Sequence, residues 1–142
     1  MKVNLNRIND DFLFECTNQH GNKILLDNTS QPDAKGVSPM EALLMSVAAC
    51  SGIDVVAILK KQRQEIENFS AEIVGERVPK DEAKPFSAID VKFILTGKVD
   101  PAKAWKAAQL SFDKYCSVSK TLEPQVKVGF TVEVNGEEVL GN

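Results

Sequence analysis

The sequence has little of what most functional classes require. Its 142 residues include one histidine, one tryptophan, one tyrosine and three cysteines, and 20 acidic against 17 basic residues give a net charge of −3. The single histidine, His20, lies in a predicted turn, so a Ser-His-Asp site has no base. Cys16 and His20 have no second pair to complete a tetrahedral site, and we expect no metal.

Other absences narrow the choice of partner, cofactor and compartment. The weak acidity argues against nucleic acid, since such proteins carry a strong basic excess, and no polybasic cluster is present to hold an anionic membrane. A glycine-rich phosphate loop is also missing, so we expect no nucleotide cofactor. Residues 1–7 lack the apolar core of a signal peptide. Three cysteines do not form a disulfide framework in a chain this long, which favours free thiols and a cytoplasmic location.

The remaining composition is that of one globular domain over residues 1–142, with 43% hydrophobic and 26% charged residues. Alternating patterns predict three short strands within residues 3–26, two long strands over 69–78 and 87–96, and a final hairpin that turns at Asn135-Gly136. Helices are predicted to start at residues 39 and 101, with a third, short helix following a break at 115–117. The order βββαββααββ predicts an α+β fold with helices on one side of antiparallel sheet.

The helix predicted from Pro39 to about residue 63 is the most unusual segment. Ser38 and Glu41 have the spacing of a capping box around Pro39. The run that follows is almost wholly apolar, and a membrane span is one interpretation. Asp54 and the many small residues favour instead a soluble helix that is buried on nearly all sides. Its length of about 37 Å exceeds what one small sheet covers, so we expect a second copy of the chain against it.

Two of the three cysteines are candidates for chemistry. Cys50 lies in mid-helix between small residues, with Asp54 one turn later on the same face. Cys116 lies at a helix break near Lys114 and Lys120, a setting that lowers a thiol pKa. Either cysteine alone is open to a purely structural interpretation, and Cys16 fits simple packing in a strand. The pair gains chemical meaning only if the two thiols meet in space.

Three blocks of the sequence carry a resemblance to a known family. They are Ser38-Pro39-Met40-Glu41-Ala42-Leu43-Leu44, Ala48-Ala49-Cys50-Ser51-Gly52-Ile53-Asp54 and Tyr115-Cys116-Ser117-Val118. With these blocks the chain resembles the OsmC/Ohr family of hydroperoxide-handling proteins. The runs Ser51–Val56 and Phe93–Gly97 bring it closest to the YhfA-like subgroup.

The resemblance implies a fold, an assembly and a reaction. The implied fold is an intertwined homodimer of antiparallel sheets with two long helices at the interface. In the implied reaction, Cys50 attacks the O–O bond of an organic or hydrogen peroxide, and Cys116 resolves the sulfenic acid as a disulfide. A dithiol or lipoyl-type reductant would then restore the thiols, without metal or other cofactor.

The chain also departs from the family pattern. The family's peroxidases have a catalytic glutamate directly after the proline that starts the helix; here Met40 holds that position. Glu41, one residue later, is therefore either catalytic or only part of the cap. The arginine that holds the thiolate has two candidates, Arg7 and Arg77, and with Asp54 these are the predicted substrate-binding residues.

These departures leave two other functions open. The first is a non-catalytic OsmC-like protein that binds a small apolar ligand or senses redox state through its thiols. The second is a hydrolase or acyl transferase that uses Cys50 or Ser51, for which the sequence offers no plausible base. A peroxidase, a binding protein and an acyl-transfer enzyme are distinguished by what surrounds Cys50.

Overall fold

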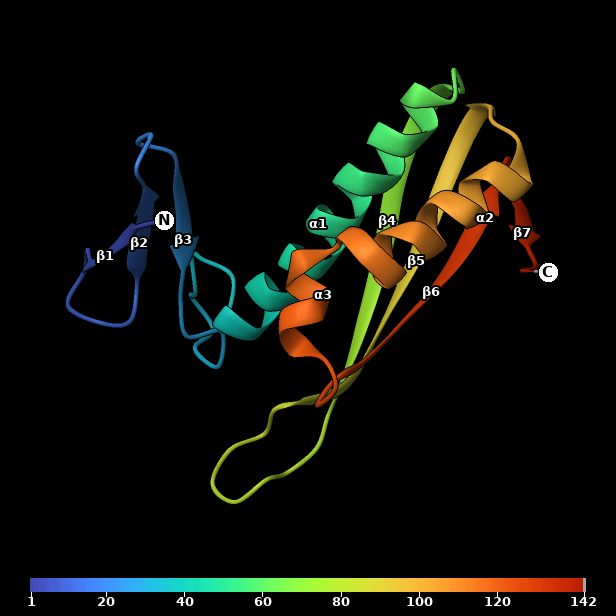
Figure 1. The fold of residues 1–142 in the computed structure, drawn as a ribbon. Coiled ribbons are helices and arrows are strands. Elements are labelled where there is room, and N and C mark those ends of the chain that lie inside the picture. Colours follow the sequence, from blue (N-terminus) through green and yellow to red (C-terminus); the bar gives the residue numbers. More distant parts are fainter. Residues whose placement is uncertain (142) are drawn as a thin grey trace. The chain divides into compact units, whose positions relative to one another are not determined.

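The computed structural model describes residues 1–141, and its elements follow the predicted order (Figure 1). The chain divides into two compact units, Met1–Leu43 and the remainder from Leu44 on, so that the boundary falls inside the long helix. Each unit has its own sheet. A single domain over 1–142 stays a prediction.

The first unit contains a three-stranded antiparallel sheet of β1 (Val3–Arg7), β2 (Phe14–Asn18) and β3 (Lys23–Leu26). The register aligns Leu5 with Cys16 and Cys16 with Ile24. Because side chains alternate along a strand, these residues share one face of the sheet. The same face carries Val3, Arg7, Phe14 and Leu26. The face is therefore mostly apolar, with Arg7 at one corner.

The long helix α1 (Pro39–Lys61) begins at the predicted residue. The Ser38 N–H donates to the Glu41 carboxylate at 2.7 Å, and the Glu41 N–H donates to the Ser38 hydroxyl at 3.1 Å. These two bonds form a complete capping box. Lys60 and Lys61 lie in the last turn, where positive charge complements the helix dipole.

The second unit contains a four-stranded sheet in the order β4-β5-β6-β7. Its strands are β4 (Glu65–Arg77), β5 (Phe86–Lys98), β6 (Lys127–Val134) and β7 (Glu137–Val139). The final hairpin turns at Asn135 and Gly136, both with positive φ, as the sequence predicts.

One strand pairing differs from the all-antiparallel prediction, because β5 and β6 run parallel. The segment between them contains α2 (Pro101–Leu110), the π-helical turn η1 (Ser111–Tyr115) and α3 (Ser117–Leu122). This helical segment carries the chain back across the sheet, which is the connection that parallel strands require. α2 is also short, so α1 alone is a long helix among the described residues.

The helices of the second unit lie on one face of its sheet (Figure 1). That face of β5 consists of fully or nearly fully buried side chains: Ile89, Val91, Phe93 and Leu95. Phe93 contacts the rings of Phe69 in β4 and Phe112 in η1, and Phe112 stacks on Phe130 in β6. The π-helical turn is thus anchored by aromatic packing directly on the sheet.

Helix α1 has two contrasting faces. Its buried residues are Val47, Ser51, Gly52, Val55 and Leu59. On its other side Met45 is 53% exposed and Ile53 is 70% exposed. Among the described residues α1 alone is long and apolar enough to cross a membrane, yet its buried residues pack inside the second unit. The chain by itself therefore covers only part of this apolar helix.

Candidate functional site

Cys50 lies in the middle of α1 and is half-buried. Two residues on, Gly52 faces Phe69 of β4, and a Cβ there would lie 3.3 Å from the Phe69 ring. The missing side chain lets the helix approach the strand closely. A groove of about 530 Å³ runs along α1 past Ala49, Gly52 and Ile53 and is bounded by Phe69 of β4. Cys50 lies on the same rigid helix but does not line this groove.

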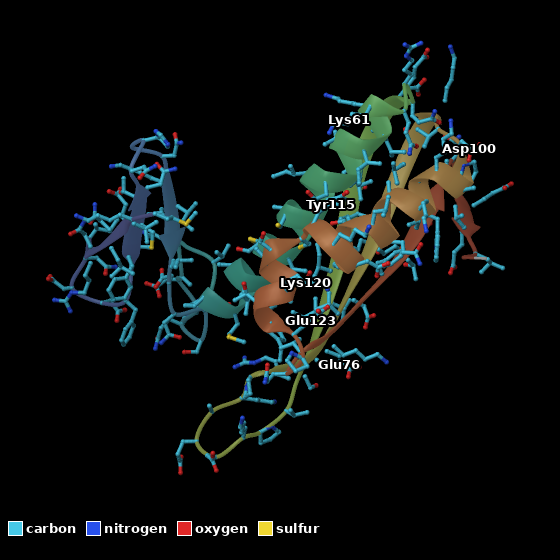
Figure 2. The ribbon with its side chains drawn as sticks, viewed as in Figure 1. Lys61, Glu76, Asp100, Tyr115, Lys120 and Glu123 are labelled. Carbon is cyan, nitrogen blue, oxygen red and sulfur yellow. The ribbon has the colours of Figure 1, made fainter. Side chains whose placement is uncertain are left out.

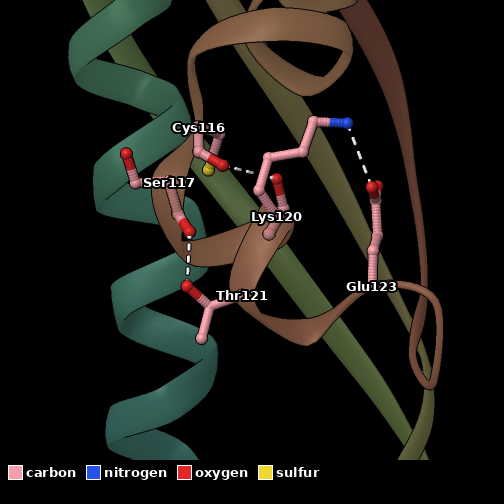
Figure 3. A network of polar contacts seen from close by, with 6 residues as sticks. Cys116, Ser117, Lys120, Thr121 and Glu123 are labelled. Carbon is pink, nitrogen blue, oxygen red and sulfur yellow. Dashed lines mark hydrogen bonds and ion pairs between the residues drawn. The ribbon is translucent and has the colours of Figure 1, made fainter.

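Cys116 lies between η1 and α3 and is fully buried (Figure 3). Its φ of −67° and ψ of 95° break the helix, as the sequence predicts. Its N–H donates to the Ser111 carbonyl at 2.8 Å and closes the π turn, while its own carbonyl accepts from the Ser119 hydroxyl at 3.0 Å. Backbone bonds on both sides thus fix the position of this thiol.

The structure brings Cys50 and Cys116 together. The Cys50 side chain lies close enough to Cys116 to raise its pKa, although burial and the contacts with Ser119 have larger influences. They lie 66 positions apart in the sequence, on α1 and at the start of α3. The juxtaposition therefore comes from tertiary packing within the second unit.

Burial is the main influence on Cys116 and raises its pKa above the ordinary value of a thiol. Contacts with the hydroxyl and the backbone of Ser119 lower it, and they are the smaller influence. The cationic setting predicted from the sequence does not operate, since neither Lys114 nor Lys120 is among the influences on the Cys116 pKa, and the Lys120 ammonium pairs with Glu123 at 3.0 Å (Figure 3). The expected lowering of the Cys116 pKa is thus wrong, and the thiol is neutral near pH 7.

Asp54 is bound to the segment that precedes Cys116. The Ser111 hydroxyl donates to Asp54 Oδ2 at 2.8 Å, and Ser111 is fully buried. Asp54 also borders a hollow of about 440 Å³ together with Lys61 and Tyr115, two residues whose side chains are labelled in Figure 2. Its carboxylate therefore links α1 to η1, and its role in substrate binding stays a prediction.

Glu41 belongs to the first unit, and its carboxylate accepts the hydrogen bond from the Ser38 N–H. This bond lowers the pKa of Glu41 below its ordinary value. The sequence left Glu41 two roles, catalysis and capping, and the structure shows Glu41 in the capping box of α1. A catalytic role stays a prediction.

The two predicted arginines differ in their surroundings. Arg7 is exposed in β1, and its guanidinium makes no hydrogen bond or ion pair with any residue from 1 to 141. Arg77 ends β4, and its Nε donates to the Lys84 carbonyl at 2.7 Å across the following loop. Arg77 thus has a structural partner that Arg7 lacks.

Two serines near the thiols were not singled out in the sequence, Ser111 and Ser119. Serine is common in proteins, so neither residue stands out in the sequence, and its hydrogen-bond partner is set only by the folded chain. The Ser111 hydroxyl, for example, bonds the Asp54 carboxylate, which is 57 positions away. Ser51, the alternative nucleophile, is fully buried and donates its hydroxyl to the Val47 carbonyl at 2.8 Å.

Within residues 1–141 no three His, Cys, Asp or Glu side chains gather in a way that could hold a metal.

Comparison with known proteins gives consistent matches over most of the chain. The model of the OsmC-like protein family matches residues 32–131. Protein YhfA of Escherichia coli (strain K12) is 40% identical over 116 residues, which are 80% of this chain and 84% of that protein.

Solved structures match as well. A hypothetical protein from Aquifex aeolicus VF5 is 33% identical, with a TM-score of 0.78, over 94% of this chain and 96% of its own. The organic hydroperoxide resistance protein OhrB of Bacillus subtilis has a TM-score of 0.62 over 94% and 96%, at 20% identity. That second likeness is one of fold alone.

The capping box predicts an acid-dependent part of the stability. Because the folded-state pKa of Glu41 is lowered, its contribution is complete above the ordinary carboxyl pKa and is lost as pH falls through the folded value. Glu41→Gln keeps an oxygen for the Ser38 N–H but cannot titrate. We expect its urea midpoint to fall less than that of wild type between pH 7 and about pH 3. Parallel curves for the two proteins would contradict this role of Glu41.

Ser119 is predicted to set how far the Cys116 pKa rises. In a Cys16→Ser, Cys50→Ser background Cys116 is the remaining thiol, and its thiolate absorbance reports one titration. Ser119→Ala removes a contact that favours the thiolate, so the midpoint should move to higher pH, whereas Thr121→Ala on the exposed side of α3 should leave it in place. A midpoint that Ser119→Ala leaves unchanged would count against the contact.

Proposed function

The chain belongs to the OsmC-like protein family, and from that premise we propose that it is a thiol-dependent peroxidase which reduces organic hydroperoxides or hydrogen peroxide. Membership bears out the resemblance drawn from the sequence. The observation that carries the proposal is the proximity of Cys50 to Cys116, which is close enough to influence the pKa of the Cys116 thiol. A peroxidase that cycles through a disulfide requires two free thiols that lie close together.

The proposed reaction has three steps. The Cys50 thiolate attacks the terminal oxygen of R–O–O–H, the O–O bond breaks, and the alkoxide leaves with a proton as R–OH. Cys50 is then a sulfenic acid, and the Cys116 sulfur displaces its hydroxyl as water to form the disulfide. A dithiol or lipoyl-type reductant returns two electrons and two protons by thiol–disulfide exchange, which restores both thiols.

Exposure and pKa support this assignment of roles. Cys50 is half-buried, so part of this residue stays open to solvent and to a small hydroperoxide. Cys116 is fully buried and its pKa is raised, so it is a poor first nucleophile at neutral pH. Cys116 is therefore assigned to the later step, in which it reacts with the sulfenic acid formed on Cys50.

A homodimer forms part of the proposal. The outer side of α1 presents Met45 and Ile53 to solvent, and burying apolar area of this kind stabilises association. A second copy of α1 is its simplest cover, because the same surface on both copies is self-complementary about a two-fold axis. The three free cysteines favour a reducing compartment such as the cytoplasm.

The proposal assigns substrate binding to Arg7 before Arg77. A guanidinium that polarises the peroxide or holds the thiolate has to be free to donate. The Nε–H of Arg77 is bonded to the Lys84 carbonyl, which ties that guanidinium to the loop although its Nη donors remain, whereas Arg7 makes no such bond with residues 1–141 and keeps all its donors. Glu41 is assigned to the cap of α1.

A ligand-binding or redox-sensing protein is the second candidate. It is favoured by the apolar lining of the groove along α1 and by the raised pKa of Cys116, which slows disulfide formation near pH 7. Absence of catalytic turnover, together with a rise in Tm on adding small apolar compounds, would establish it in place of the peroxidase.

The cysteine roles give a direct test. Peroxide should convert wild type to a protein with a Cys50–Cys116 disulfide, identified by mass spectrometry after alkylation. Cys50→Ser should abolish dithiol-dependent peroxide consumption. Cys116→Ser should stop after one equivalent with Cys50 oxidised, and Cys16→Ser should behave as wild type. If Cys50 and Cys116 both remain alkylatable after excess peroxide, the mechanism is wrong.

The arginine assignment predicts a difference between two matched variants. Arg7→Met should lower kcat/KM for a hydroperoxide by about 10- to 100-fold, the cost of one hydrogen bond to a charged group. Arg77→Met should lower it far less and instead reduce Tm, because it frees the Lys84 carbonyl. The reverse ranking of the two variants would move the assignment to Arg77.

A further inference from the structure

Ser111 is a buried polar residue that the proposed reaction does not use directly. It is fully buried, and its hydroxyl donates to Asp54 Oδ2 at 2.8 Å. Its carbonyl accepts the Cys116 N–H at 2.8 Å. One residue therefore holds a carboxylate of α1 with its side chain and the peptide of Cys116 with its backbone.

The bond from Ser111 to Asp54 connects the two segments that carry the thiols, because Asp54 lies on the same helix as Cys50. Asp54 is four residues after Cys50, which places it one turn along the same face of α1. The chain of bonds from Asp54 through Ser111 to Cys116 thus fastens the segment bearing one thiol to the helix bearing the other. Ser111 is also the first residue of the π turn, which is itself fixed by Phe112 against the sheet.

The reaction that depends on this distance is the closure of the disulfide. A disulfide needs its Cβ atoms about 3.5–4.5 Å apart, with a narrow range of dihedral angles. While Cys50 is a sulfenic acid, closure competes with a second peroxide, which transfers an oxygen to give the sulfinic acid and R–OH. The fraction that ends as sulfinic acid therefore measures how well the Cys116 thiol is placed.

We propose that Ser111 is a positioning residue: its bond to Asp54 holds the Cys116 segment against α1 so that the disulfide closes before Cys50 is over-oxidised. The inference rests on the proposed function for its peroxide chemistry. Asp54 accordingly acts through Ser111 on the placement of the second thiol, in place of a contact with substrate.

Four variants distinguish the effect of losing the Ser111–Asp54 bond from the effect of a generally looser core. Ser111→Ala and Asp54→Ala each break it. Asp54→Asn keeps an oxygen that accepts the Ser111 hydroxyl and serves as the conservative rescue. Ser51→Ala removes another fully buried serine hydroxyl, next to Cys50, whose bond to the Val47 carbonyl stays within α1. Ser51→Ala is therefore the matched control.

The first measurement is intact mass spectrometry after graded pulses of cumene hydroperoxide. We expect the ratio of sulfinic acid to disulfide to rise about two- to tenfold in Ser111→Ala and Asp54→Ala, the range for one hydrogen bond. Asp54→Asn and Ser51→Ala should stay close to wild type. An unchanged ratio in Ser111→Ala, or an equal rise in Ser51→Ala, would overturn the inference.

The second measurement does not depend on peroxide. Diamide, an azo compound that takes two electrons and two protons from a dithiol, closes the same disulfide by adding to one thiol and being displaced by the other. The rate of closure should fall about two- to tenfold in Ser111→Ala and recover in Asp54→Asn. If wild type ignores peroxide but these diamide rates hold, the peroxidase proposal fails while the positioning role stands. If wild type consumes peroxide and Ser111→Ala closes as fast as wild type with diamide, the positioning role fails alone.

Discussion

A 23-residue helix whose side chains are almost all apolar has to be shielded from water over most of its circumference, and this need organises the second unit. The sheet shields one side of α1, with Gly52 permitting contact at Phe69. The opposite side keeps Ile53 and Met45 in solvent. Small residues around Cys50 satisfy both demands, since they allow close packing within the chain and leave room outside it for a ligand or a second helix.

Burial also explains why the two thiols are unequal. Cys50 belongs to the partly covered helix and keeps access to solvent, whereas Cys116 is enclosed by α3 and the π turn and stays protonated near neutral pH. Two identical side chains thereby become one partly accessible thiol and one buried thiol. The difference between the two thiols follows from packing. The contacts with Ser119 lower the pKa of Cys116 and so reduce this difference.

Local signals in the sequence predict local structure well. Ser38 and Glu41 specify the start of α1, Asn135-Gly136 specifies the last turn, and the break before Cys116 is visible in the pattern. The bond from Ser111 to Asp54, 57 positions away, depends on tertiary placement that no periodicity encodes. The parallel pairing of β5 with β6 was missed for a related reason, since it is set by the path of α2 and α3 across the sheet.

The π turn carries a consequence for how this chain tolerates changes of length. Its closing bond joins Ser111 to Cys116, five positions on, in place of the usual four. Deleting one residue there restores the ordinary helical pitch and rotates the next position by about 100°, which turns Cys116 away from Cys50. The loop at residues 78–85, bridged by Lys80 and Ala83, has no such dependence. Insertions and deletions in the lineage of this protein should therefore accumulate in that loop and be purged between α2 and α3.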